Sequence, residues 1–290
     1  MINYNEDVLI VLSLSKNQMV LNITVVKTGF LAVTTLIEAL LDERASRKDI
    51  SIRSVSSGAK MNKVDIDAVE QLAKSIDTDL FIVVSPNASL DGPKNLALNL
   101  GKLKPTILIS DNPATKIIEE LKGKIGYIII QADPLIGIRK EFLDPIEMSN
   151  FNSDVIKVLS ITGAFSALIH ALDSFINEST NGNANLPNII IDKHQALEHS
   201  GLSNPYAKSK ALASYEMARL VGRLSAEGGY KEKDREKYLL VVSASHELIR
   251  QAAKLADEAR ELEKENDTVH RNIHDSSGKT LTKKKFFDTL

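Results

Sequence analysis

The sequence of 290 residues contains no cysteine and no tryptophan. The lack of cysteine excludes disulfides, thiolate zinc sites, iron–sulfur clusters and a cysteine nucleophile, and it is typical of a protein from a reducing cytoplasm. Long apolar runs are missing too, because none reaches the roughly 18 residues that span a bilayer. Residues 8–14 are apolar but follow Glu6 and Asp7 instead of a basic segment, unlike a secretion signal. We expect a cytoplasmic protein without a membrane segment.

The charge balance also excludes a class of partners. Lysine and arginine number 36 against 38 aspartates and glutamates, for a formal net charge of -2. Without a basic excess, we expect no nucleic-acid partner. The 43% apolar and 26% charged residues are typical of a globular protein, and the length suggests about two domains.

The first half of the sequence alternates β-branched runs with helical patterns. The runs that we predict as strands are residues 21–26, 49–55, 80–84, 105–110 and 126–130. Helices are predicted over residues 31–47 and 69–75, the second one with Asp67 and Glu70 as a capping box. The alternation indicates an α/β fold with a mostly parallel sheet and helices on both faces.

The second half is dominated by long helices. We predict helices over residues 145–177, 205–227 and 234–266, a short strand at 188–192, and a β hairpin within 270–287 that turns at Asp275 to Gly278. The predicted organisation is therefore an N-terminal extension (1–18), an α/β domain (19–143), and a helical domain with a small β extension (144–290).

Three motifs fail on inspection. Gly29 follows a strand as in a dinucleotide-binding loop, but Leu31 and Thr34 occupy the next glycine positions, which argues against NAD or NADP. Gly278 and Lys279 resemble the end of a phosphate loop that lacks its first glycine. His270 and His274 have metal-ligand spacing but no accompanying glutamate, so we interpret them as surface histidines and expect no metal site.

Polar residues in the strand-end loops form a first group of candidates, because ligands of parallel sheets bind at the carboxyl ends of the strands. Ser57, Gly58 and Lys60 follow the second strand, where small residues expose backbone N–H groups to an anion and a lysine neutralises it. An ordinary polar turn is the alternative. Pro86 and Asn87 follow the third strand and Asp111 ends the fourth, with turn chemistry as the alternative.

A second group lies near the start of the helical half. Asp133 and Arg139 precede Asp144, Pro145 and Glu147, a strong helix-start signal. Asp133 and Arg139 belong either to a charged connection or to the lip of a cleft between the two halves. For Asp144 and Glu147, capping of the helix is the alternative to binding. His246 lies within a helix among small residues; a core or interface role is the alternative to a functional one.

The chain resembles the archaeal coenzyme F420-dependent methylenetetrahydromethanopterin dehydrogenases from about residue 19 to 287. The segments that carry the resemblance are LLDERASR at 40–47, SGAKM at 57–61, Pro86-Asn87, Ala132-Asp133-Pro134, GIRKEFLDPIEM at 137–148, Asn204-Pro205-Tyr206-Ala207 and SASHE at 243–247. Their length and spread make a chance similarity improbable.

The resemblance implies reversible hydride transfer between methylenetetrahydromethanopterin and coenzyme F420, a dissociable cosubstrate, in one-carbon metabolism of the methanogenic type. It also implies a homohexamer. Such a reaction needs positioning and electrostatics rather than a covalent nucleophile, so we assign no catalytic side chain. For the coenzyme we expect Lys27, Gly29, Ser57, Gly58, Lys60, Pro86, Asn87 and Asp111, and for the pterin Asp133, Arg139, Asp144, Glu147 and His246.

The sequence departs from the family in the first strand-end loop. Lys27, Gly29 and Thr34 match the family pattern, whereas Phe30 replaces an asparagine and Ala32 a glycine; Gln131 replaces a lysine. Ala32 adds a side chain where the family leaves backbone free. Two alternatives follow from these differences: a paralogue that uses another pterin or hydride carrier, or one without catalytic activity.

Overall fold

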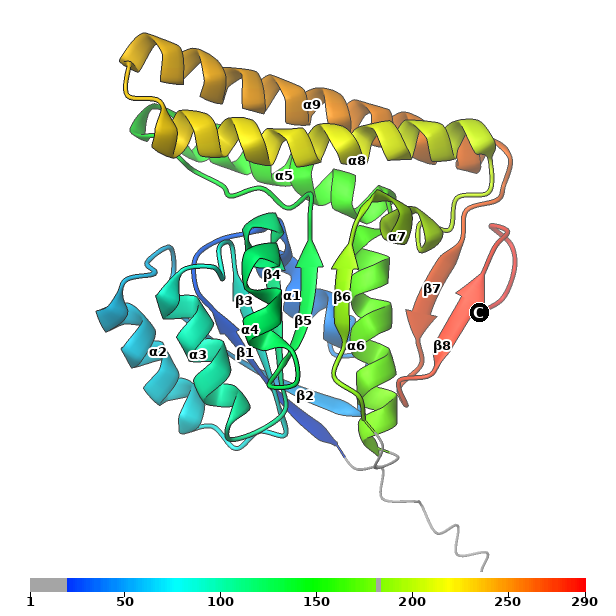
Figure 1. Cartoon of the computed structure of the whole chain (residues 1–290). Coiled ribbons are helices and arrows are strands. Elements are labelled where there is room, and N and C mark those ends of the chain that lie inside the picture. Colours follow the sequence, from blue (N-terminus) through cyan, green and yellow to red (C-terminus); the bar gives the residue numbers. More distant parts are fainter. Residues whose placement is uncertain (1–19, 181–183) are drawn as a thin grey trace, which may run out of the picture.

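A computed structural model describes residues 20–180 and 184–290 of the chain. Its centre is a parallel six-stranded sheet with the order β2-β1-β3-β4-β5-β6 (Figure 1). The strands are β1 (Leu21–Lys27), β2 (Ile50–Ser56), β3 (Leu80–Ser85), β4 (Thr106–Asp111), β5 (Gly126–Ile130) and β6 (Asn188–Ile191). The predicted N-terminal extension, residues 1–18, lies outside the described residues.

Helices cover both faces of the sheet, as predicted. Apolar side chains of α2 (Lys63–Lys74), α3 (Asp91–Gly101) and α4 (Ile118–Leu121) share one core with the first face. Those of α1 (Ala32–Asp42) and α6 (Ala164–Thr180) belong to the core on the other face. Strands β3, β4 and β5 are buried along their whole length, which is why they are continuous apolar runs instead of alternating ones.

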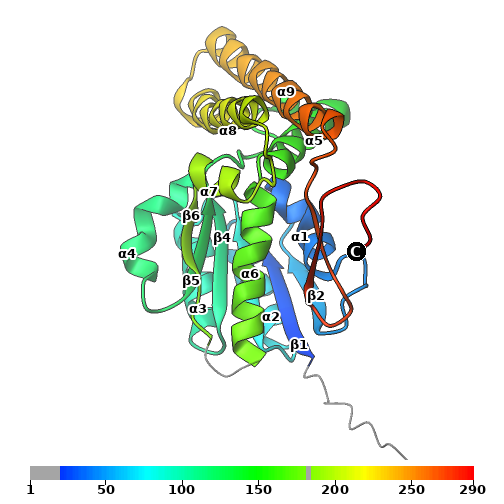
Figure 2. The same cartoon turned by 90° about the vertical axis from the view of Figure 1, so that its right-hand side faces the viewer.

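A helical layer covers the carboxyl end of the sheet. It consists of α5 (Pro145–Ile161), α8 (Pro205–Ala226) and α9 (Arg235–Glu265), with α8 and α9 lying side by side in both views (Figures 1 and 2). The short α7 (Lys193–Glu198) connects β6 to this layer, and the antiparallel hairpin β7 (Arg271–His274) and β8 (Thr280–Lys283) follows α9. The fold class and the small β extension are confirmed.

The sheet takes its last strand from the second half of the sequence. Residues 188–191 of β6 pair in parallel with residues 127–130 of β5. The division into domains after residue 143 stays a prediction, but the sheet itself extends beyond that boundary.

The prediction of one helix over residues 145–177 is wrong. The chain breaks at Thr162 and Gly163, and α5 and α6 meet there at an angle of 64°. Gly163 has a φ of 94°, and a Cβ atom added to it would lie 2.2 Å from the carbonyl oxygen of Ala196 in α7. The bend thus depends on a glycine that admits close approach of a distant segment.

Two predicted helix boundaries also differ. The helix predicted over 31–47 ends at Asp42, because Glu43, Arg44 and Ala45 have left-handed φ angles of 47°, 62° and 66°. The predicted capping box of Asp67 and Glu70 is wrong: α2 begins earlier, and its N-cap Asn62 accepts a hydrogen bond from the Asp65 N–H at 3.1 Å. Within α2, Asp67 and Glu70 instead pair with Lys63 and Lys74.

No single helix in the described part of the chain is long and apolar enough to cross a membrane. Within residues 20–180 and 184–290, only α5 and α6 taken together across their bend reach the required length and hydropathy.

Candidate functional site

A cavity of about 380 Å³ lies between the carboxyl end of the sheet and the helical layer. We call it the strand-end cavity. It is lined by Met61 after β2, Pro86, Asn87 and Leu90 after β3, Asp111 and Pro113 of the β4 loop, Leu135 and Ile138 after β5, and Gly222, Ser225, Ala226 and Tyr230 of α8 and the following turn. Chain order reverses at β1, which lies between β2 and β3, and parallel sheets bind ligands at such a reversal.

Three predicted residues, Pro86, Asn87 and Asp111, line this cavity. Neither the apolar wall of the cavity nor the contribution of α8 to it was predicted from the sequence. One signal was available for α8: Gly222, Ser225 and Ala226 are small and spaced three and four apart, so they share one helix face. What covers the strand ends, however, is decided by tertiary packing.

The loop after β1 supports one wall of the cavity. Gly29 has a φ of 79°, and a Cβ there would lie 2.8 Å from Pro86 Cγ and 3.1 Å from Met61 Sδ. Its backbone N–H donates to the Gly58 carbonyl at 2.8 Å. The predicted residues Gly29 and Gly58 therefore join the loops after β1 and β2 beside the cavity.

The two predicted lysines of these loops differ in their surroundings. Lys27 forms an ion pair with Glu38 on α1 and is mostly buried. Lys60 is exposed, and the Ser57 hydroxyl donates to its backbone carbonyl at 2.6 Å. Lys60 therefore has its charge available for an anion, whereas the charge of Lys27 is already neutralised.

Two acidic residues at the carboxyl end of the sheet are buried: Asp111, which lines the cavity, and Asp133, which does not. Burial raises the pKa of the Asp111 carboxyl well above its usual value, with the charge of Asp133 adding to the effect, and backbone N–H groups of Asn112 and Asp133 oppose it. Burial raises the pKa of Asp133 to about 7, against hydrogen bonds from the backbone of Val33 and Ala32. Asp111 thus places a carboxyl group of reduced charge at an apolar cavity, where it can exchange hydrogen bonds with a ring heteroatom.

Asp133, Arg139 and Asp144 use their polar atoms within the protein. Both Asp133 oxygens accept backbone N–H groups of α1. Arg139 donates to the carbonyls of Gly228 and Glu232 at 2.8 and 2.9 Å, which ties the segment before α5 to the turn between α8 and α9. The Asp144 side chain caps α5, as predicted, by accepting from Ile146 and Glu147.

The structure brings Glu147 and His246 together at a groove of about 490 Å³ between α5 and α9. The His246 Nδ1 lies 3.3 Å from Glu147 Oε2, and the imidazole packs against the rings of Phe142 and Phe151. Burial lowers the pKa of His246 despite the neighbouring carboxylate. A neutral imidazole that shares a hydrogen bond with Glu147 is the result.

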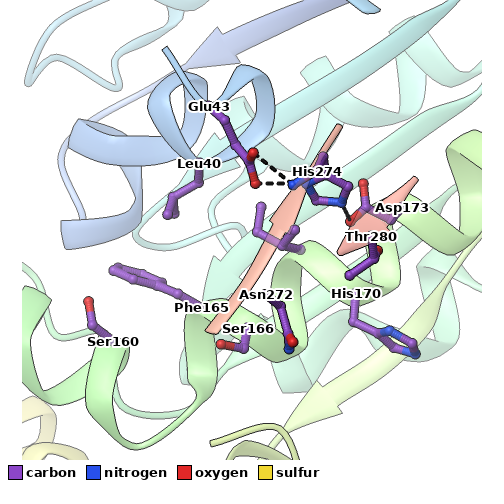
Figure 3. A pocket seen from close by; sticks show the side chains of 11 residues that line it. Leu40, Glu43, Ser160, Phe165, Ser166, His170, Asp173, Asn272, His274 and Thr280 are labelled. Carbon is purple, nitrogen blue, oxygen red and sulfur yellow. Dashed lines mark hydrogen bonds and ion pairs between the residues drawn. The ribbon is translucent and has the colours of Figure 1, made fainter. Parts of the chain in front are cut away.

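His274 is not a surface residue, which corrects the sequence-based interpretation. It is 8% exposed and borders a smaller cavity of about 280 Å³ beside α6. Its Nδ1 and Nε2 each lie 2.8 Å from a carboxylate oxygen, of Glu43 and Asp173 respectively (Figure 3). Asp173 also accepts from Arg47, which donates two further hydrogen bonds to Asp49. The polar alternation of the hairpin gave no sign of this buried network.

Within residues 20–180 and 184–290, no group of three or more histidines and acidic residues has the arrangement of a metal site.

Comparison with known proteins identifies the family. The family model of methylene-5,6,7,8-tetrahydromethanopterin dehydrogenase matches residues 21–290. The chain belongs to this family. It is 49% identical over 267 residues to the F420-dependent methylenetetrahydromethanopterin dehydrogenase of Archaeoglobus fulgidus, which covers 91% of this chain and 97% of the relative. The enzyme of that name from Methanothermobacter marburgensis is 43% identical over 92% of this chain and 98% of its own length.

A solved structure of the family agrees with the fold. It is an F420-dependent methylenetetrahydromethanopterin dehydrogenase in complex with methylenetetrahydromethanopterin and coenzyme F420. Its TM-score is 0.89 at 37% identity, over 93% of this chain and 99% of that chain. The resemblance stated from the sequence motifs is therefore confirmed over nearly the whole chain.

Proposed function

We propose that this chain is an oxidoreductase that transfers a hydride reversibly between methylenetetrahydromethanopterin and coenzyme F420. The observation that carries the proposal is family membership over residues 21–290, together with relatives of that name at 49% and 43% identity. The homohexamer and the absence of a resident metal belong to the same proposal and rest on the resemblance. The cytoplasmic location also belongs to it and rests on the composition of the sequence.

The residues at the strand-end cavity suit coenzyme F420. The cavity has apolar walls for a planar ring, and Asn87 and Asp111 place polar groups among them. Coenzyme F420 carries a phosphate group, and the exposed Lys60, beside the small residues Ser57 and Gly58, offers its positive charge to that phosphate. When bound, the coenzyme supplies the ring carbon C5 that accepts or returns the hydride. The protein's part is to hold the two reacting carbons together and to keep water out.

For the pterin, we propose Glu147 and His246 as the binding residues. Both line the groove between α5 and α9, and together they offer a carboxylate and an imidazole to the donors and acceptors of a pterin. Arg139 and Asp144 would support this side indirectly, because their hydrogen bonds fix the start of α5 and the turn before α9.

Gly222 offers a direct test of the proposed coenzyme site. A Cβ atom at Gly222 has open space, since its nearest neighbour is Pro134 Cβ at 3.9 Å. A leucine there would extend into the cavity, whereas an alanine would only touch its wall. We expect Gly222→Leu to weaken coenzyme F420 binding about tenfold or more, and Gly222→Ala to leave it nearly unchanged.

The measurement is calorimetric titration of each purified variant with coenzyme F420, together with F420 reduction by methylenetetrahydromethanopterin followed by absorbance. Equal affinities of the leucine and alanine variants would show that the coenzyme binds elsewhere. A wild-type protein that neither binds nor reduces F420 would overturn the proposed function itself.

A further inference from the structure

Asp133 follows β5 and does not line the strand-end cavity, so it has no access to a ligand there. Its carboxyl group is fully buried, with an exposed fraction of 0%. Oδ1 accepts from the Ala32 N–H at 2.8 Å and Oδ2 from the Val33 N–H at 3.1 Å. A buried carboxylate bound by the first amides of a helix is stabilised by those dipoles in place of a cation. Both oxygens therefore accept hydrogen bonds from the first amides of α1.

Helix α1 has no cap of its own that could do the same. Its N-cap residue is Leu31, whose side chain cannot accept a hydrogen bond. Thr34 satisfies only the Leu31 N–H, at 3.0 Å. Asp133 supplies the missing acceptor from about 100 residues away in the sequence. A local cap would stabilise the helix equally well, but only a distant one fixes the helix relative to the sheet.

The second observation is that Asp133 joins segments that follow two strands lying far apart in the sheet. Asp133 follows β5 and α1 follows β1, and the strand order places both β3 and β4 between them. Pro86, in the loop after β3, and Asp111, at the end of β4, therefore lie between the two segments that the Asp133 side chain joins, and both line the cavity. The backbone N–H of Asp133 is also near enough to the Asp111 carboxyl to lower its pKa, against the effect of burial. One side chain thus connects the loops on either side of the proposed coenzyme site.

We propose that Asp133 is a positioning residue for coenzyme binding: its carboxylate fixes the start of α1, and through it the loop of Thr28 to Leu31 that supports the cavity wall. Gly29 in this loop is in close contact with Pro86 and Met61, so a shift of α1 moves two wall residues. The inference rests on the proposed function, because it takes the strand-end cavity as the coenzyme site.

Asp133→Asn tests the role with almost no change of volume. The amide keeps one acceptor but turns an NH₂ group toward the second helix N–H, so one tie is lost. Asp192→Ala is the control for the loss of a helix cap: Oδ1 of Asp192 accepts both amides, of His194 and Gln195, at the start of α7, so asparagine would keep this cap and alanine removes it. Asp192 does not line the cavity. Both variants weaken the start of a helix.

We expect Asp133→Asn to raise the Kd and KM for coenzyme F420 about tenfold and to change kcat at saturating coenzyme less than about threefold. Asp192→Ala should lower the thermal midpoint without changing either constant. A coenzyme Kd of Asp133→Asn equal to that of the control would overturn the positioning role. Failure of the wild type to bind F420 would instead overturn the proposed function.

Hydrogen exchange of the wild type keeps the inference testable if Asp133→Asn does not fold. If the hydrogen bonds between Asp133 and the start of α1 favour coenzyme binding, bound coenzyme must in turn stabilise these hydrogen bonds, because coupling is reciprocal. We expect F420 to slow exchange of the Ala32 and Val33 amides. Unchanged exchange of these amides at saturating F420 would contradict the inference.

Discussion

Single carboxylates join distant parts of this chain. Asp133 binds the start of α1, and Glu43 and Asp173 hold His274 of the C-terminal hairpin between them. Glu43 also accepts from the His274 backbone N–H at 2.8 Å. A neutral imidazole has one N–H, so two carboxylates facing both ring nitrogens favour the imidazolium. Asp173 contributes most to raising the pKa of His274, burial opposes the increase, and Glu43 adds to it.

This raised pKa predicts how stability depends on pH. The unfolded value is near 6.5, so the contribution of His274 is complete below that pH and is lost as pH rises through the higher folded value. At pH 6, we expect His274→Gln to lower the free energy of unfolding by about 3 kcal/mol, because it leaves Glu43 and Asp173 without their cation. In this variant Arg47 still neutralises part of the charge, because it forms an ion pair with Asp173. Denaturant titrations from pH 6 to 9 measure the effect.

His194→Gln is the control for this prediction, because His194 is exposed. The difference between the wild type and His274→Gln should shrink as pH rises, whereas the difference for His194→Gln should stay near zero. A penalty for His274→Gln that is the same at both ends of the range would show that the side chain is held as a neutral imidazole.

Among the elements, the bend between α5 and α6 has the clearest single cause. We expect Gly163→Ala to cost about 4 kcal/mol or more, because its Cβ would overlap the Ala196 carbonyl and its φ of 94° is unfavourable for alanine. Gly123→Ala provides the control: Gly123 has a φ of 70° but nothing within 4 Å of the added atom, so only about 1 kcal/mol of backbone strain is expected. Chemical denaturation of both variants measures the two costs, and equal values would exclude the contact with α7 as the cause.

The same bend marks the limit of prediction from the sequence. Strands β1 to β5 and the hairpin are predictable because β-branched runs and turn residues are local signals. Gly163 lies in a helical pattern that reads as continuous, and the segment that requires the break is more than 30 residues away. Likewise, residues 188–191 are recognisable as a strand, but parallel pairing with β5 leaves no trace in either segment.

At the scale of the whole molecule, the sheet supplies the loops and the helical layer closes them into a cavity. The strand-end rule predicted Pro86, Asn87 and Asp111 from the sequence. The small residues of α8 indicate a face that another element approaches closely, but nothing local shows that this helix, or Tyr230 after it, covers the strand ends. Phe30, which departs from the family pattern, is 41% exposed in the loop after β1. A different side chain at this position therefore leaves the core of the fold unaffected.

Direct hydride transfer between two carbon atoms is the central claim, and isotope transfer tests it most directly. The protein is incubated with coenzyme F420 and methylenetetrahydromethanopterin that carries two deuterium atoms on the methylene carbon, and the reduced coenzyme is analysed by mass spectrometry. The account predicts that the methylene carbon loses one deuteride to become the methenyl cation, and that reduced F420 carries one deuterium at C5. No reduction, or reduced F420 without deuterium, would contradict it.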